Sequence, residues 1–85
     1  MFYTYIIYSK KIDSYYCGQT TNLSNRLLEH NSGETKSIAK GIPWSLIGYQ
    51  IFDSRKEAIL KERQIKNRGI KRWLAYSSDS LITNL

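Results

Sequence analysis

The stretch FYTYIIYSKKIDSYYCGQT, residues 2–20, decides the fold of this chain. Its first part, residues 2–9, is rich in aromatic and β-branched side chains, which is typical of a β-strand. The polar residues 10–14 predict a turn, and residues 15–20 predict a returning strand, so we expect an antiparallel hairpin. Gly18 inside the returning strand predicts a bulge or a close approach of another group to the backbone.

A helix and a third strand are predicted next. Asn22 is a good N-cap for a helix that runs to about Asn31, and Gly33 is a natural stop. Residues 34–41 have no strong structural pattern, and we expect a polar, basic loop there. After this loop, residues 44–52 (WSLIGYQIF) predict the third strand.

Two helices are predicted to close the chain. Ser54 and Glu57 fit a capping box, which predicts a helix from there to about Asn67 that is ended by Gly69. Residues 70–76 predict a short final helix, and the tail that follows is weakly specified.

The predicted order is therefore β-β-α-β-α-α, without repeats or linkers. Because sequential strands tend to be neighbours, we expect an α+β fold: a small three-stranded, mostly antiparallel sheet flanked by helices. A length of 85 residues predicts one domain over residues 1–85, with a modest core. No run of about 18 apolar residues predicts a membrane span, and the N-terminus lacks the features of a signal peptide. The lone Cys17 indicates a reducing, cytoplasmic setting and is expected to be a small buried residue.

The positive charge is concentrated in one segment. The net charge of the chain is +6, and residues 55–72 alone sum to +6. A basic face of this kind is typical of proteins that bind a phosphate backbone, although a solvated helix face is the alternative. The predicted DNA-binding residues are Arg55, Lys56, Lys61, Arg63, Lys66, Arg68, Lys71 and Arg72.

Glu62 is the most informative single residue of the chain. At 100° per residue it projects within about 60° of Ala58 and Ile65, which should face the sheet. A carboxylate in that sector must be paired, bound to a metal or placed at the rim of a cleft. The plainer alternative is a surface carboxylate paired with Lys66 at i+4.

Arg26 and His30 are spaced i, i+4, so both side chains lie on one helix face. A guanidinium there can grip a phosphate through two parallel hydrogen bonds. The alternative is a solvent-facing Arg26 and a His30 that is hydrogen-bonded at the margin of the core. The tyrosines are ambiguous one by one, because most of the seven are expected to be packing residues. A tyrosine serves as a general base only if positive charge or a metal lowers its pKa.

Taken together, these residues resemble a known family, the GIY-YIG nuclease domain, in its small stand-alone UPF0213 (YhbQ-like) type. The similarity covers residues 2 to about 75, and the stretches that carry it are YTY at 3–5, YCG at 16–18, TTNLSNRLLEHN at 20–31 and SRKEAILKE at 54–62. The first motif departs from the family pattern, because it lacks the leading glycine and isoleucine. Cys17 replaces the middle isoleucine of the second motif.

The resemblance implies hydrolysis of DNA phosphodiester bonds with one divalent ion, Mg²⁺ or Mn²⁺. Glu62 would hold the metal, Arg26 would stabilise charge on the phosphate and His30 would orient a tyrosine or the attacking water. Either Tyr5 or Tyr16 would help to deprotonate that water. Asn67 is a weaker candidate, and its alternative role is a helix cap.

The expected function is thus that of a DNA endonuclease with low intrinsic sequence specificity, in DNA repair or recombination. The full enzymes of the family usually carry a second domain that selects the DNA, so a separate protein partner for targeting is a further expectation. The alternative is a non-catalytic nucleic-acid-binding or interaction module on the same fold. A pure binding module has no need of Glu62 near the apolar face, which favours catalysis.

Overall fold

The computed structural model describes residues 1–76 and residue 81, and this part of the chain forms three strands and four helical segments. In chain order they are β1 (Phe2–Ser9), β2 (Ser14–Thr20), α1 (Leu23–Asn31), the 3₁₀ helix η1 (Lys36–Gly41), β3 (Ser45–Phe52), α2 (Arg55–Arg68) and α3 (Ile70–Tyr76). This confirms the predicted α+β fold and its element order. The predicted tail, residues 77–85, lies outside the described residues except for Leu81.

The sheet has the strand order β2-β1-β3, and both pairings are antiparallel. Tyr5 in the central strand lies opposite Gly18 on one side and Tyr49 on the other. The register with β2 is continuous, whereas the register with β3 shifts between Ile6 and Ile7. The continuous pairing excludes a bulge at Gly18. The second explanation, a close approach of another group to the backbone, is the one that remains.

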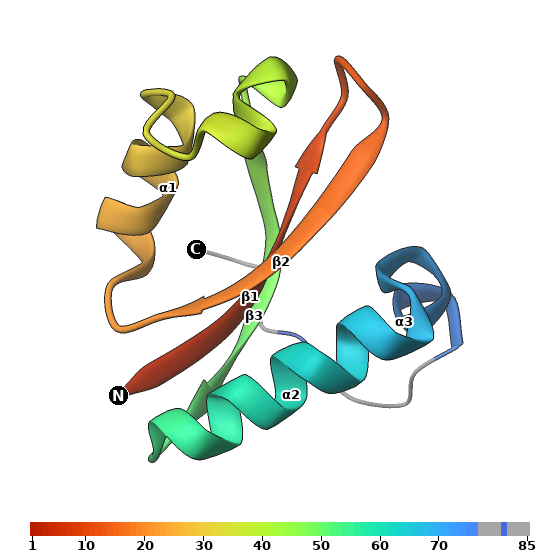
Figure 1. Cartoon of the computed structure of the whole chain (residues 1–85). Helices are drawn as coiled ribbons and strands as arrows, with labels where there is room; N and C mark the ends of the chain where they lie inside the picture. The colour runs from red at the N-terminus through yellow and green to blue at the C-terminus, as the bar shows by residue number, and fades with distance from the viewer. Residues whose placement is uncertain (77–80, 82–85) are drawn as a thin grey trace.

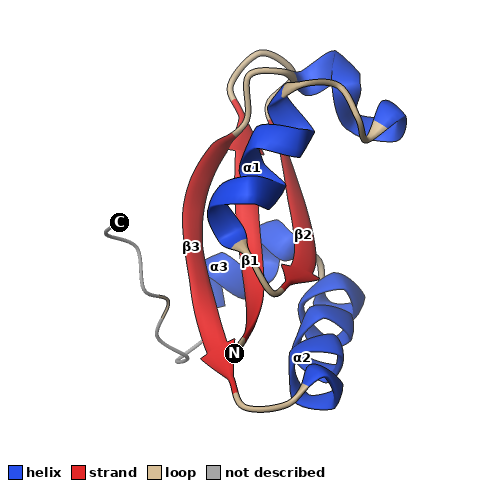
Figure 2. Cartoon of the chain, turned by 90° about the vertical axis from the view of Figure 1, so that its left-hand side faces the viewer, coloured by secondary structure: helices blue, strands red, loops and turns tan. Residues whose placement is uncertain are grey.

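The alternation of side chains along β1 divides the core into two layers. Tyr5 and Ile7 face α1 together with Trp44, and Ile6 faces the opposite side with Ile65 and Trp73. Figure 1 shows the sheet nearly edge-on, with α1 on one side and α2 and α3 on the other, and Figure 2 shows α1 in front of the strands. Covering both faces is what allows so small a sheet to be stable.

Local capping explains where the two longer helices begin. The Asn22 side chain accepts a hydrogen bond from the backbone N–H of Asn25 at 3.0 Å, and the Ser54 side chain accepts one from the N–H of Glu57 at 3.2 Å. Each satisfies a backbone donor that has no partner within its helix. Gly69, which has a positive φ of 92°, caps the C-terminus of α2.

The segment 34–41 corrects the sequence-based expectation of a loop, because residues 36–41 form η1. The stabilising contacts come from residues outside the segment. The Trp44 indole Nε1 donates to the Ile38 carbonyl at 2.9 Å, and Ser9 Oγ donates to the Gly41 carbonyl at 2.6 Å. Trp44 itself is buried and exchanges two hydrogen bonds with the Asn31 side chain, at 2.6 and 3.0 Å. These contacts fix η1 beside the C-terminal end of α1.

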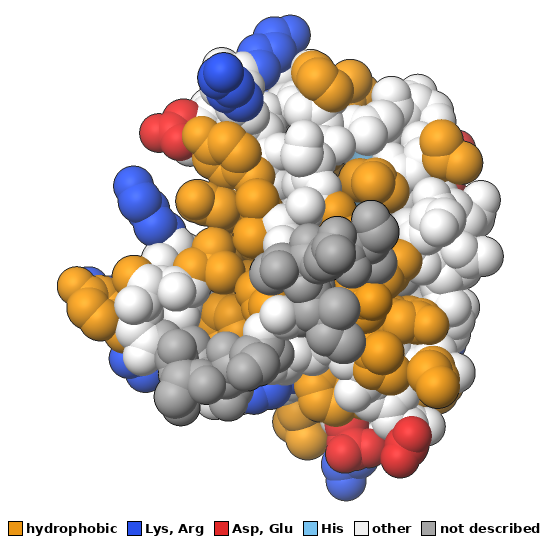
Figure 3. All heavy atoms as spheres, turned by 180° about the vertical axis from the view of Figure 1, so that it is seen from behind, with side chains coloured by type: hydrophobic (Ala, Val, Ile, Leu, Met, Phe, Trp, Pro, Cys, Tyr) orange, Lys and Arg blue, Asp and Glu red, His pale blue; other side chains and the backbone are white. Residues whose placement is uncertain are grey.

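Seen from behind, apolar side chains gather over the middle of the molecule, whereas Lys and Arg side chains lie toward its margins (Figure 3). The positive charge is therefore not concentrated at the middle of that face. Among the helices that the structure describes, none is long and apolar enough to cross a membrane.

Candidate active site

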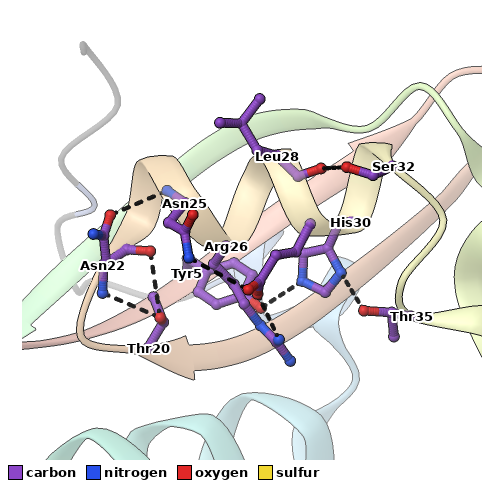
Figure 4. Close-up of polar contacts among 10 residues, drawn as sticks. Tyr5, Thr20, Asn22, Asn25, Arg26, Leu28, His30, Ser32 and Thr35 are labelled. Carbon is purple, nitrogen blue, oxygen red and sulfur yellow. Dashed lines mark hydrogen bonds and ion pairs between the residues drawn. The ribbon is translucent and has the colours of Figure 1, made fainter.

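A buried hydrogen-bonded chain connects β1, α1 and the residue that precedes η1. Tyr5 Oη lies 2.7 Å from His30 Nε2, and His30 Nδ1 lies 3.0 Å from Thr35 Oγ1 (Figure 4). Tyr5 is 2% exposed and His30 is completely buried. The predicted helix face thus brings His30 to Tyr5, and it does so deeper in the core than the sequence pattern indicated.

The environment of this chain determines its protonation. Burial raises the pKa of Tyr5 to about 12, although hydrogen bonding and charge from Arg26 act in the opposite direction. Burial, followed by the charge of Arg26, lowers the pKa of His30. Both side chains are therefore uncharged at neutral pH.

The same contacts assign the direction of the hydrogen bonds. The positive charge of Arg26 acts on the Tyr5 hydroxyl and favours the orientation in which the phenol oxygen faces the guanidinium and the phenol proton points to His30 Nε2. His30 then carries its proton on Nδ1 and donates to Thr35 Oγ1. Tyr5 and Thr35 together fix the ring orientation and the tautomer of His30.

Gly18 provides the space that Tyr5 occupies. A Cβ atom at this position would lie 2.6 Å from Tyr5 Oη and 2.8 Å from Tyr5 Cζ, which is closer than such atoms approach. The glycine of the second sequence motif is therefore required by the phenol of the first. This is the close approach that the sequence predicted.

Arg26 lies at the solvent edge of the buried chain. Its Nη1 donates to Glu29 Oε1 at 3.1 Å, and 38% of its side chain remains exposed. In Figure 4 the guanidinium is directed toward Tyr5 and β2 rather than away from the domain. One face of Arg26 is thus held by protein groups while the other is accessible to an anion.

Tyr16 connects this group to the opposite face of the sheet. Its ring packs edge-on against His30, with 5.4 Å between the ring centroids, and the Lys66 ammonium lies 5.5 Å from the Tyr16 ring centroid. Tyr16 is half-buried on β2, which is an edge strand. Residues from α1 and α2 therefore meet around the edge of β2.

Glu62 is placed on the α2 side of that edge. Its Oε2 accepts from Lys66 Nζ at 2.7 Å, which confirms the pairing considered as the plainer alternative. The side chain is 21% exposed. Burial, and then the charge of Glu62, raise the pKa of the buried Cys17 thiol to about 12. The carboxylate is thus at the rim of the apolar layer, as its helical position predicted.

Two hollows that carry basic side chains lie at the two ends of β2. The first contains both Arg26 and Arg55, and the second contains both Lys66 and Lys71. The guanidinium of Arg55 stacks over the Phe2 ring at 5.1 Å, which limits its freedom. The remaining predicted DNA-binding residues line neither hollow; they are Lys56, Lys61, Arg63, Arg68 and Arg72.

The donor set fits an open metal site and no closed one. Among residues 1–76 and 81, no group of three or more His, Cys, Asp or Glu side chains could hold a metal. A single carboxylate that already contacts a cation is compatible with Mg²⁺ or Mn²⁺, because Mg²⁺ keeps several waters and uses phosphate oxygens as ligands. Of the predicted residues, Glu62 would hold such an ion.

The structure groups four of the predicted catalytic residues, Tyr5, Tyr16, Arg26 and His30, on the α1 side. Glu62 is connected to them only through Lys66, and Asn67 lies outside the group. Asn67 is exposed in the last turn of α2 and lines neither hollow, and the C-cap is Gly69. Sequence reasoning missed Thr35, a polar residue in a segment without a pattern.

The fold belongs to the class of small α+β domains in which a three-stranded antiparallel sheet is covered by helices on both faces. Within that class, the chain belongs to the GIY-YIG family, because the model of the GIY-YIG catalytic domain matches residues 1–72. This is a nuclease-type family, and its members generally use divalent metal ions.

Relatives support the same assignment. A UPF0213 protein of Haloquadratum walsbyi is 36% identical over 66 residues, which is 76% of this chain and 73% of the relative. A UPF0213 protein of Streptococcus pyogenes serotype M5 is 41% identical over 63 residues, or 72% of this chain and 68% of the relative. No solved structure matches the chain.

Proposed function

We propose that this protein is a metal-dependent endonuclease that hydrolyses DNA phosphodiester bonds with little sequence preference. The observation that carries the proposal is the arrangement around the edge of β2. There, Tyr16 contacts His30 from α1 on one face and Lys66, the partner of Glu62, on the other.

Each side chain has a distinct role in the proposed reaction. Arg26 is held by Tyr5 and Glu29, so its accessible edge binds the non-bridging oxygens of the phosphate and stabilises their developing charge. Tyr5 keeps its proton and positions His30, because its pKa is raised to about 12. We assign the proton-accepting role to Tyr16, the half-buried tyrosine whose ring lies beside the Lys66 ammonium.

Glu62 completes the site as the group that would hold the Mg²⁺ or Mn²⁺ ion. When bound there, the ion would lower the pKa of water and neutralise charge on the phosphate. Water attacks phosphorus and the bond to the leaving oxygen breaks. The water proton passes to the Tyr16 hydroxyl oxygen as the phenol proton passes to solvent, and the leaving oxygen takes a proton from solvent.

Binding is proposed to rest on backbone contacts. Arg55, Lys66 and Lys71 line the hollows that flank the site, so they are the cations best placed to meet phosphates on either side of the scissile bond. A cytoplasmic setting and a separate targeting partner remain part of the same proposal.

The test is cleavage of a supercoiled plasmid and of a branched duplex in the presence of Mg²⁺ or Mn²⁺. The parent protein should nick the DNA, whereas Arg26→Ala and Glu62→Gln should not. Asn67→Ala, an exposed residue outside the hollows, is the matched control and should cut like the parent. An inert parent, or a Glu62→Gln variant with full activity, would contradict the proposal.

A second candidate function is a non-catalytic nucleic-acid-binding module. The Glu62–Lys66 ion pair supports the binding module, because it gives the carboxylate a protein partner and a structural role that needs no metal. This candidate predicts that DNA binding occurs without cleavage under every metal condition, and that Glu62→Gln leaves binding unchanged or tighter.

A further inference from the structure

Lys66 occupies a distinctive position between two of the proposed catalytic residues. Its ammonium lies 2.7 Å from Glu62 Oε2 and 5.5 Å from the centroid of the Tyr16 ring. Lys66 is also 44% exposed at its side chain and lines the hollow that contains Lys71. One flexible cation thus contacts the only carboxylate assigned to the metal and borders a solvent-open hollow.

This contact is weak enough to exchange. A partly exposed i, i+4 ion pair contributes little to stability, because water screens the charges and both side chains lose rotamer freedom. A divalent ion on the same carboxylate repels the ammonium, since both carry positive charge. The four-carbon stem of lysine lets the ammonium move several ångströms without any change in the helix.

We propose that Lys66 is an exchangeable internal cation that competes with the divalent metal for Glu62. In the absence of metal, Lys66 neutralises the carboxylate beside Tyr16. When metal binds, the ammonium moves into the hollow next to Lys71 and contacts a phosphate of the bound strand. This inference rests on the proposed function, because it assumes that Glu62 is the metal ligand.

Competition predicts effects of opposite sign on two ligands. In Lys66→Gln, Mn²⁺ titrated without DNA should bind about two- to five-fold more tightly, which is the range that an exposed ion pair of this kind can oppose. The affinity for a duplex should fall, and the slope of log affinity against log salt should decrease in size by about one. A merely structural Lys66 would weaken both interactions. Mn²⁺ binding is measured by electron paramagnetic resonance of the free ion and by calorimetry.

Two variants serve as controls. Lys66→Arg keeps a cation beside Glu62 and should not bind Mn²⁺ more tightly than the parent. Lys40→Gln removes the same charge from an exposed position on η1, which packs beside α1 on the other face of the sheet, and should leave the Mn²⁺ affinity unchanged. Tighter Mn²⁺ binding by Lys40→Gln would show that the net charge of the protein alone sets the Mn²⁺ affinity, and it would overturn the proposal.

The movement of Lys66 has its own readout. In the parent protein, the Lys66 methylene signals should be displaced by the Tyr16 ring current, and they are assigned by their loss in Lys66→Gln. Saturation with diamagnetic Mg²⁺ should return them toward ordinary lysine shifts. If Mg²⁺ binds and these signals do not move, Lys66 does not exchange.

Glu62→Gln separates failure of this inference from failure of the proposed function. If Glu62→Gln binds Mn²⁺ as well as the parent, the metal site is misassigned and both proposals fail. If Glu62→Gln loses Mn²⁺ but Lys66→Gln binds it equally or less tightly, the metal site stands and competition by Lys66 is overturned.

Discussion

Gly18 and Tyr5 are directly opposite each other in the β1–β2 ladder, and the absence of a side chain on one makes room for the phenol of the other. The Tyr5 ring cannot retreat easily, because its hydroxyl is held by His30 at 2.7 Å in a buried site. The two tyrosine motifs of the sequence therefore form one structural unit.

The first prediction concerns this contact. Gly18→Ala should lower the free energy of unfolding by about 1–3 kcal/mol, because the new methyl group overpacks the site and displaces the Tyr5 hydroxyl. Urea denaturation measures the loss. In a Tyr5→Phe background the same substitution should be less harmful, since the nearest atom is gone. Equal losses in the two backgrounds would show that the clash is elsewhere.

The second prediction separates the two tyrosines. Tyr5→Phe should destabilise the fold by about 1–3 kcal/mol, because buried His30 Nε2 loses its donor. Tyr16→Phe keeps the packing against His30 and should change stability by less than about 1 kcal/mol, yet reduce cleavage by about 10²- to 10⁴-fold. Thermal unfolding and plasmid nicking give the two readouts. Full cleavage by Tyr16→Phe would return the proton-accepting role to Tyr5 or to water.

The third prediction is a pH dependence of stability. Burial lowers the pKa of His30, so the unfolded chain binds this proton more readily than the folded one. The stabilisation from neutral His30 is therefore fully present above the ordinary histidine pKa, about 6.5, and is lost as the pH falls through the lower folded value. The free energy of unfolding should decrease between pH 7 and 5. His30→Gln should be less stable at every pH, but its free energy of unfolding should change less between pH 7 and 5. Parallel curves for the variant and the parent would show that His30 does not cause the pH dependence.

The fourth prediction concerns Thr35, which accepts from His30 Nδ1. Thr35→Val leaves the Nδ1–H buried without a partner and should cost about 1–3 kcal/mol of stability. If Thr35 positions His30 for the reaction, Thr35→Val should also reduce kcat more than it raises KM. Thr35→Ser retains the hydroxyl and should recover most of both losses. No recovery by serine would mean that the threonine methyl group, rather than its hydroxyl, matters.

The elements that were predictable from the sequence are those specified by residues close together along the chain. The run of aromatic and β-branched side chains specifies β1, and the capping pair of Ser54 and Glu57 specifies the start of α2. By contrast, η1 is stabilised by contacts from Trp44 and Ser9, which no local pattern encodes. Residues without a local signal become ordered here because side chains outside the segment supply the hydrogen bonds.

The same distinction applies to the candidate site. Helical spacing alone places His30 on the inner face of α1, but its complete burial depends on Thr35 and the turn into η1. Spacing also places Glu62 near the apolar layer. It cannot determine whether the carboxylate meets Lys66 or a metal, because both partners suit the same geometry and differ only in which cation is available.

The fifth prediction tests which cations meet the phosphate backbone. Arg55 shares a hollow with Arg26 and is held over Phe2, so little entropy is lost when it binds a phosphate. Arg55→Gln should weaken duplex binding and reduce the size of the salt slope by about one. Arg68→Gln removes the same charge at the exposed end of α2, outside both hollows, and should change the slope by less. Fluorescence anisotropy across a salt titration measures both variants. Equal slopes for the two would mean that the segment 55–72 attracts DNA through its total charge, and that the hollow beside Arg26 does not position the strand.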